Sequence, residues 1–191
     1  LAEAKGQISV ERRDEIHAAI QGLPLMVGRT LGLFDDIRPL AHSLTAARSA
    51  LYLGRDVLFP VALEGALKLK ELSYIHAEGF ASGEMKHGPI ALIEEGLPVV
   101  ALLAADELMG KAASNLQEAA ARGGRIILIT EERAASTVDF AESVITVPNV
   151  DPLLAPVLLT VPVQILAYLT AFEKGTDVDQ PRNLAKSVTV E

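Results

Sequence analysis

The sequence predicts an α/β fold, a three-layer α/β/α sandwich around a five-stranded parallel sheet. Short, continuously apolar runs alternate along the chain with longer segments of helical character. A strand that is apolar throughout is typical of a parallel sheet covered by helices on both faces, because neither face meets water. Half of the 191 residues are hydrophobic and the mean hydropathy is positive, so the chain has enough apolar surface for such a core. This alternation indicates a doubly wound sheet of the flavodoxin-like type.

Turn residues and apolar patterns place the individual elements. Pro60 suits the first turn of a helix, where its missing N–H costs nothing, and Gly123 with Gly124 suits a helix end. The expected strands are residues 49–55, 76–80, 97–104, 125–130 and 143–148. The expected helices are residues 8–21, 33–48, 60–75, 106–122 and 153–174, of which the first ends near Gly22.

These elements divide the chain into three parts. Residues 1–48 carry two amphipathic helices before the first strand and are interpreted as a helical connector. Residues 49–175 hold all five strands and form the sheet domain. Residues 176–191 are too polar for a helix and are expected to form an irregular C-terminal tail.

Composition and charge narrow the possible functions. The net charge of −8 disfavours non-specific binding to nucleic acid or to an anionic membrane surface. The chain contains no cysteine, which excludes disulfides, thiolate metal sites and a cysteine nucleophile. The N-terminal residues are polar without an apolar signal segment, so we expect a cytoplasmic protein. No glycine-rich nucleotide motif is present and the histidines lack metal-ligand spacing, so neither a cofactor nor a metal is expected.

Residues 153–172 form a nearly uncharged run that is long enough to cross a bilayer, for which about 20 apolar residues suffice. Pro156, Pro162 and Gln164 interrupt this run, and it lacks the basic and aromatic flanks of a membrane span. We expect instead a helix buried between the sheet and a subunit partner.

Glu64, Lys68 and Glu71 are spaced to share one face of the expected helix at 60–75. One interpretation is a solvated stripe with an ion pair. The other is a catalytic base beside a cation. A ketose–aldose isomerase needs a carboxylate to carry a proton between C1 and C2, and a positive group to stabilise the enediolate, and Glu71 with Lys68 can supply both.

Two further groups have both a structural and a functional interpretation. His76 is most simply structural, whereas His87 lies in a polar, glycine-containing loop and could open a sugar ring by protonating its oxygen. Arg182 and Lys186 are the cations of the C-terminal tail. The tail is either a frayed terminus or a lid whose lysine reaches the sugar carbonyl, as an acid or as a Schiff-base amine.

Three segments resemble isomerising glutamine–fructose-6-phosphate aminotransferases, also called glucosamine-6-phosphate synthases. They are residues 62–71, 83–89 and 177–191, and the resemblance extends over residues 51–191. It implies a cofactor-free enzyme that makes glucosamine 6-phosphate from fructose 6-phosphate and glutamine. In that family a glutaminase domain precedes two sugar isomerase (SIS) subdomains, and this chain resembles the second of them, with residues 1–48 resembling the connector between the halves.

The resemblance also implies roles for individual residues. Glu71 matches the base for proton transfer, and Lys68 matches a lysine that assists at the enediolate. His87 matches the ring-opening histidine, which in the family reaches the site of a neighbouring subunit, so a homodimer is implied.

In the tail, Lys186 matches the lysine that engages the sugar carbonyl. Arg182 and Ala185 match positions that close over the sugar and the mouth of the ammonia channel. All of the residues given roles by the resemblance lie in the three segments that carry it.

The sequence departs from the whole enzyme in ways that limit what it does alone. It has no cysteine for a glutaminase, and the turn after the first strand, residues 54–60, has no hydroxyl for a phosphate. We therefore expect a piece of the enzyme that needs the first SIS half and the glutaminase domain, and that binds sugar phosphate weakly or not at all by itself. Two alternatives are a regulatory SIS module that binds sugar phosphates without catalysis and a purely structural dimerisation unit.

Overall fold

Five parallel strands form one sheet, with the order β2-β1-β3-β4-β5. The computed structural model describes residues 2–184. The strands are β1 (Ser49–Gly54), β2 (His76–Ala81), β3 (Pro98–Leu103), β4 (Arg125–Glu131) and β5 (Ser143–Val147). Ser49 pairs with His76 and Pro98 with Arg125, so the strands begin together at an amino edge and end together at a carboxyl edge. The predicted five-stranded parallel sheet is confirmed.

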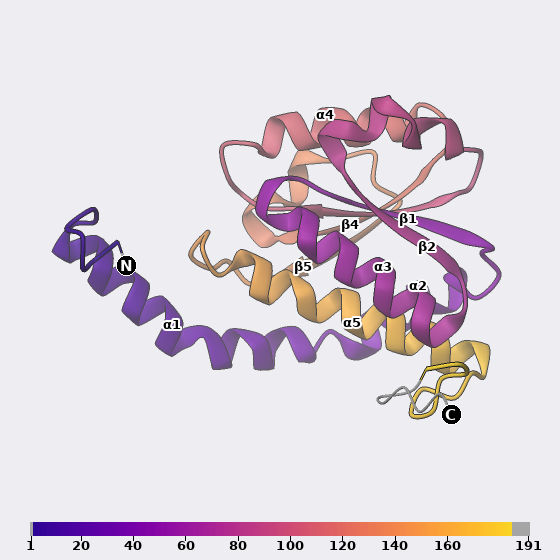
Figure 1. Cartoon of the computed structure of the whole chain (residues 1–191), viewed down its shortest axis with the longest axis horizontal. Coiled ribbons are helices and arrows are strands. Elements are labelled where there is room, and N and C mark those ends of the chain that lie inside the picture. Colours follow the sequence, from indigo (N-terminus) through magenta and orange to yellow (C-terminus); the bar gives the residue numbers. More distant parts are fainter. Residues whose placement is uncertain (1, 185–191) are drawn as a thin grey trace, which may run out of the picture.

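Helices cover both faces of the sheet and make the three layers visible in Figure 1. The α-helices are α1 (Val10–Leu31), α2 (Phe34–Leu44), α3 (Phe59–Ser73), α4 (Met109–Ala120) and α5 (Ala155–Lys174). The 3-10 helices are η1 (Asp56–Leu58), η2 (Ser82–His87), η3 (Pro89–Leu92) and η4 (Glu132–Thr137). The core beneath α2, α3 and α5 is separate from the core beneath α4 and the short helices η2 to η4.

The two cores follow from the alternation of side chains along each strand. In β4, Ile127 and Ile129 are fully buried against the α3–α5 side, whereas Ile126 and Leu128 are buried on the α4 side. Every residue of β3 is buried, which is why this strand has no polar positions in the sequence.

Helix α3 lies unusually close to the sheet because two glycines leave room for it. A Cβ atom on Gly65 would stand 2.7 Å from the ring of Tyr52 in β1. A Cβ atom on Gly79 of β2 would stand 2.9 Å from the backbone of Leu63. These approaches are shorter than any carbon contact allows, so both positions require glycine and hold α3 tightly against β1 and β2.

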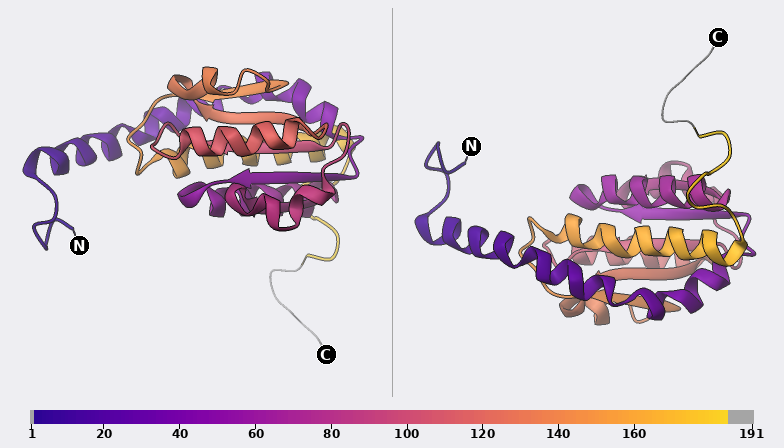
Figure 2. Two further views of the ribbon diagram at one scale, coloured as in Figure 1. Left: turned by 90° about the horizontal axis from the view of Figure 1, so that it is seen from above. Right: turned by 90° about the horizontal axis from the view of Figure 1, so that it is seen from below.

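Helix α1 differs from its prediction, since it continues past Gly22 and Pro24 to Leu31. The expected end near Gly22 is therefore wrong. Its last turns pack on the core through Met26 and Val27, and this burial outweighs the cost of about 1 kcal/mol for a glycine inside a helix. The first half of α1 runs away from the domain (Figure 2).

Helix α5 is long and apolar enough to cross a membrane by length and composition. In the structure it packs against α2 and α3, and 61% of its most apolar window is buried inside the protein. It is therefore a core helix, as its prolines indicated.

Candidate functional site

The last turns of α3 bring Lys68 and Glu71 into contact. The Lys68 Nζ lies 2.8 Å from Glu71 Oε2 and 3.9 Å from Glu64 Oε1. The Glu71 side chain is 26% exposed and that of Lys68 33%, so the pair is half-buried and still open to a ligand. The structure therefore places a carboxylate and an ammonium side by side, which is the arrangement that proton transfer next to a developing enediolate needs.

The Glu71 carboxylate also favours the positively charged form of Lys68. The hydrogen bond to Glu71 raises the pKa of Lys68 above its ordinary value, with further support from the charges of Glu64 and Glu71. Because the protonated form is favoured, Lys68 is a cation throughout the neutral range. It is thus suited to stabilise negative charge and unsuited to act as a neutral base.

Glu71 and the C-terminal tail line a common hollow of about 370 Å³, which we call the tail groove. Its lining residues are Leu67, Lys70, Glu71, Tyr74, Arg182, Asn183 and Leu184. The groove joins the end of α3 to a segment more than a hundred positions later in the sequence. Two of the three segments that resemble the aminotransferases, residues 62–71 and 177–191, therefore meet here.

The tail reaches the groove along a path that is held by its own polar groups. Thr176 Oγ1 donates to the carbonyl of Leu72 at 2.7 Å, which fixes the start of the tail on α3. Asp177 Oδ1 accepts from the backbone N–H groups of Asp179 and Gln180, both at 2.9 Å. The first residues of the tail therefore follow a defined course, and Arg182 is brought to the end of α3.

Ala185 and Lys186 lie outside the described residues. Their predicted roles at the sugar carbonyl and at the channel mouth therefore remain predictions.

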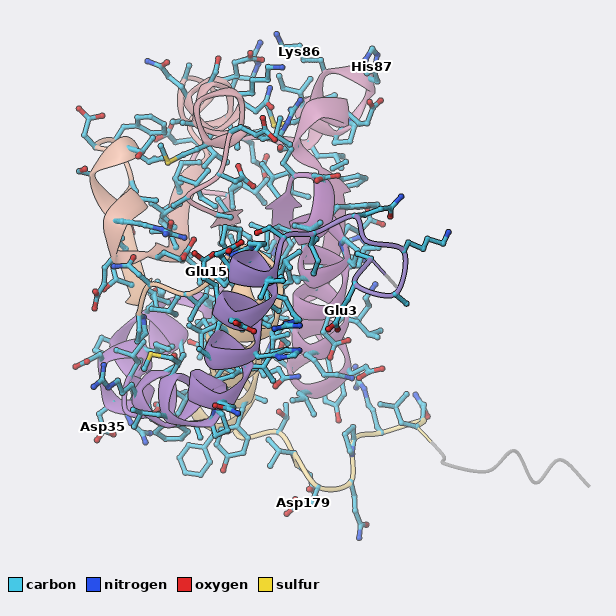
Figure 3. The ribbon with its side chains drawn as sticks, turned by 90° about the vertical axis from the view of Figure 1, so that its left-hand side faces the viewer. Glu3, Glu15, Asp35, Lys86, His87 and Asp179 are labelled. Carbon is cyan, nitrogen blue, oxygen red and sulfur yellow. The ribbon has the colours of Figure 1, made fainter. Side chains whose placement is uncertain are left out.

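His87 lies far from Glu71 in this chain. It ends η2, which follows the carboxyl end of β2 and packs with α4, whereas Glu71 lies five positions before the amino end of β2 on the opposite face. The length of β2, about 17 Å for six residues, therefore separates them along the strand direction. Figure 3 shows His87 at the top of the molecule and the tail residue Asp179 at the bottom.

The environment of His87 leaves it available to another molecule. Its side chain is 75% exposed, and its nearest carboxylate, Glu84, is 4.0 Å away. A histidine held so loosely contributes little to folding. One chain thus presents an exposed imidazole at one edge and a carboxylate–ammonium pair at the other.

The carboxyl edge after β1 is where open α/β sheets commonly bind ligands. At this edge Arg55 donates from Nη1 to Asn115 Oδ1 at 3.2 Å. A hollow beside Arg55 and Asp106 has a volume of about 10 Å³, which is room for a single water. The loops at 54–56 and 82–87 share this edge, but Glu71 lies at the opposite, amino edge of the sheet.

Two residues with evident importance for this geometry were missed at the sequence level. Arg55 links the loop after β1 to Asn115 of α4 at the carboxyl edge of the sheet. Tyr74 follows α3 directly and contacts Arg182, and its only sequence signal is a tyrosine where a helix usually ends in glycine. Within residues 2–184, no group of three or more histidine, aspartate or glutamate side chains is placed to hold a metal ion.

Comparison with known proteins identifies the domain. Residues 43–174 match the SIS domain family. The chain belongs to that family. The glutamine–fructose-6-phosphate aminotransferase [isomerizing] of Rhizobium meliloti is 52% identical to this SIS domain over 192 residues, which is 99% of the chain and 31% of that protein. The protein of the same name from Brucella abortus is 51% identical, over 100% of the chain and 32% of its own length.

Solved structures agree with the sequence matches. The C-terminal domain of the glucosamine-fructose-6-phosphate aminotransferase from Francisella tularensis has a TM-score of 0.90 and 40% identity, and it covers 94% of this chain and 50% of that one. Tagatose-6-phosphate ketose/aldose isomerase from Escherichia coli has a TM-score of 0.67 at 20% identity, over 86% of this chain and 47% of that one, which shows a shared fold.

These matches confirm the resemblance to the isomerising aminotransferases and the SIS fold. The chain spans about a third of the length of the curated relatives it matches.

Proposed function

We propose that this SIS domain is the second sugar isomerase half of an isomerising glutamine–fructose-6-phosphate aminotransferase. The reaction converts fructose 6-phosphate and glutamine-derived ammonia into glucosamine 6-phosphate, without a cofactor. The observation that carries the proposal is the contact between Lys68 and Glu71, together with the position of Glu71 on the wall of the tail groove. The identity of about half to proteins of that name supports it.

In this proposal Glu71 carries the proton between C1 and C2 of the open-chain sugar. Its carboxylate is near enough to Lys68 for the ammonium to stabilise the enediolate that forms between the two transfers. Lys186 engages the sugar carbonyl, and Arg182 and Ala185 help the tail to close over the sugar. The proposed role of Arg182 is supported by its position in the groove that Glu71 also lines.

We propose further that each site is completed by other parts of the enzyme. The turn after β1 has no hydroxyl side chain at 54–60 to hold a phosphate, so the first SIS half supplies the phosphate site and this domain alone is inactive. Because His87 is exposed and far from Glu71, it opens the sugar ring in the site of a neighbouring subunit of a homodimer. The glutaminase domain supplies ammonia, and the enzyme works in the cytoplasm.

The test is a Glu71→Gln substitution in the full-length enzyme that carries this domain. Loss of the base is expected to lower the rate of conversion of fructose 6-phosphate to glucose 6-phosphate by about a hundredfold or more, because positioned general bases contribute about that much. Glutamine hydrolysis should continue, since another domain performs it.

Glu173→Gln is a matched control for this substitution. Glu173 is 23% exposed and pairs with Arg38 at 2.9 Å, which closely resembles the exposure and pairing of Glu71, but it joins α2 to α5 away from the tail groove. The control should keep its isomerisation rate. If Glu71→Gln isomerises as fast as the control, Glu71 is not the base, and a sensor that binds sugar phosphate without turnover becomes the better interpretation.

A further inference from the structure

Tyr74 occupies a backbone conformation that a tyrosine rarely adopts. It is the first residue after α3, with φ 60° and ψ 16°, and its N–H donates to the carbonyl of Lys70 at 3.1 Å. This left-handed position ends many helices, but glycine usually occupies it because other residues meet steric strain there. We therefore expect interactions of the Tyr74 side chain to offset the strain of this backbone conformation.

The side chain of Tyr74 makes two interactions with Arg182 of the tail. The phenolic oxygen accepts a hydrogen bond from the backbone N–H of Arg182 at 3.0 Å, across 108 positions of sequence. The Arg182 guanidinium lies over the ring, 4.1 Å from its centre. A cation at this distance over an aromatic face is attracted by the ring quadrupole.

These contacts hold the far part of the tail to the domain. Among the described residues after Thr176, Arg182 is the one with a hydrogen bond to the body of the protein, and the other tail bonds are local. Tyr74 also stands three positions after Glu71 on the same wall of the tail groove. Whatever fixes Arg182 on Tyr74 therefore fixes it relative to the proposed base.

We propose that Tyr74 is a positioning residue that anchors the C-terminal tail to the helix carrying Glu71. The inference rests on the proposed function, in which the tail closes over the sugar. The two contacts with Arg182 hold this part of the tail against the end of α3. Lys186 follows Arg182 by four positions, so the anchor limits how far that amine departs from Glu71.

Two substitutions distinguish the proposed role of Tyr74 as an anchor of the tail from its role in ending α3. Tyr74→Gly keeps the left-handed cap and relieves its strain, so α3 should end normally while both contacts with Arg182 disappear. Tyr74→Phe loses the hydrogen bond and keeps the ring beneath the guanidinium. Tyr168→Phe is the control, because this hydroxyl is on α5 and the ring of Tyr168 packs against Phe34 and Phe172 instead of the tail.

The first measurement is hydrogen exchange of the tail amides in this chain. In Tyr74→Gly the Arg182 amide should exchange about tenfold faster, since a hydrogen bond and a cation–π contact are lost together. Tyr74→Phe should give a smaller increase, and Tyr168→Phe none. The thermal midpoint of Tyr74→Gly should equal or exceed that of the wild type. Unchanged exchange at Arg182 in Tyr74→Gly would overturn the anchor.

The second measurement is kinetic and uses the full-length enzyme. Tyr74→Gly should lower kcat for isomerisation about tenfold, and Tyr74→Phe should recover most of that loss, whereas a cap with no positioning role would leave kcat unchanged in both. A loosened tail with unchanged kcat would overturn the positioning role. Glu71→Gln is measured in parallel to distinguish failure of the proposed function from failure of the Tyr74 anchor. If Glu71→Gln retains isomerase activity, the proposed function is wrong. The exchange measurement then still decides whether Tyr74 anchors the tail.

Discussion

Glu131 is a fully buried carboxylate at the end of β4 that joins three segments of chain. Its Oε2 accepts from the N–H of Ala105 after β3 at 3.0 Å, and its Oε1 accepts from Arg133 Nη2 at 2.8 Å and from the N–H of Val150 at 3.2 Å. A buried charge is stable only when it is paired and hydrogen-bonded in this way. Glu131 therefore fixes the carboxyl edge, opposite the end that carries Glu71.

Glu131→Gln is expected to destabilise the chain by about 3 kcal/mol, because the amide turns an N–H₂ group toward donors and leaves at least one of them unpaired. Urea unfolding, followed by circular dichroism, measures the change. The exposed neighbour Glu132 provides the control, since Glu132→Gln should alter stability by less than about 0.5 kcal/mol. Equal midpoints for the two variants would show that the carboxylate does not hold this edge.

Helix α1 is attached to the domain by two kinds of contact, one apolar and one electrostatic. Its last turns are packed on the core, where Thr30 is fully buried. Its first turn is held by a pair of hydrogen bonds from Arg12 to Asp151, at 2.6 and 2.9 Å, in the loop before α5. The second attachment is electrostatic, so it should depend on pH while the first does not.

The hydrogen bonds from Arg12 hold the pKa of Asp151 below its ordinary value of 3.8, with help from the N–H of Leu153. The folded pKa is below the unfolded one, so the contribution of this contact to stability is present above about pH 4 and is lost as pH falls through the lowered pKa. Arg12→Gln should therefore raise the pKa of Asp151, measured by carboxyl-carbon NMR titration. Arg13→Gln should not, because Arg13 bonds to Asp14 instead. A titration of Asp151 unaffected by Arg12→Gln would contradict the attachment.

At the scale of the molecule, the sheet could be predicted because burial alone determines its pattern. Strand β3 is apolar throughout and β4 is apolar from Ile126 to Ile129, since helices cover both of their faces. The end of α1 could not be predicted in the same way, because packing after Pro24 overrides the local preference of Gly22. The local sequence pattern therefore predicts the strands of the sheet, whereas tertiary packing determines where α1 ends.

In the candidate site, too, some contacts could be predicted from the sequence and others could not. The pairing of Lys68 with Glu71 follows from helical spacing and could be predicted. The contact of Tyr74 with Arg182 could not, since it depends on the path of the chain through α5. Only sixteen positions separate Glu71 from His87 in the sequence, yet β2 carries them to opposite edges of the sheet. The sequence spacing alone does not reveal this. This separation leads to a prediction for the assembled enzyme.

If His87 serves the site of a neighbouring subunit, two inactive variants should restore activity when they are mixed. Glu71→Gln and His87→Ala chains of the full-length enzyme are each expected to be inactive in isomerisation. In a dimer of one chain of each kind, one site combines an intact Glu71 with an intact His87. Random pairing of equal amounts should therefore recover about a quarter of the wild-type rate, since half of the dimers are mixed and each has one complete site.

A second mixture, of Glu71→Gln with Lys68→Ala, is the control for this complementation. Both residues lie on α3 and contact each other, so every site in the mixed dimer lacks one of them and no activity should return. The rate of glucose 6-phosphate formation after co-expression and purification measures both mixtures. Recovery in neither mixture would place His87 and Glu71 in sites within one subunit, which requires η2 to move across the sheet edge toward the tail groove. Recovery in the first alone shows that the exposed imidazole and the carboxylate–ammonium pair act together only between two chains.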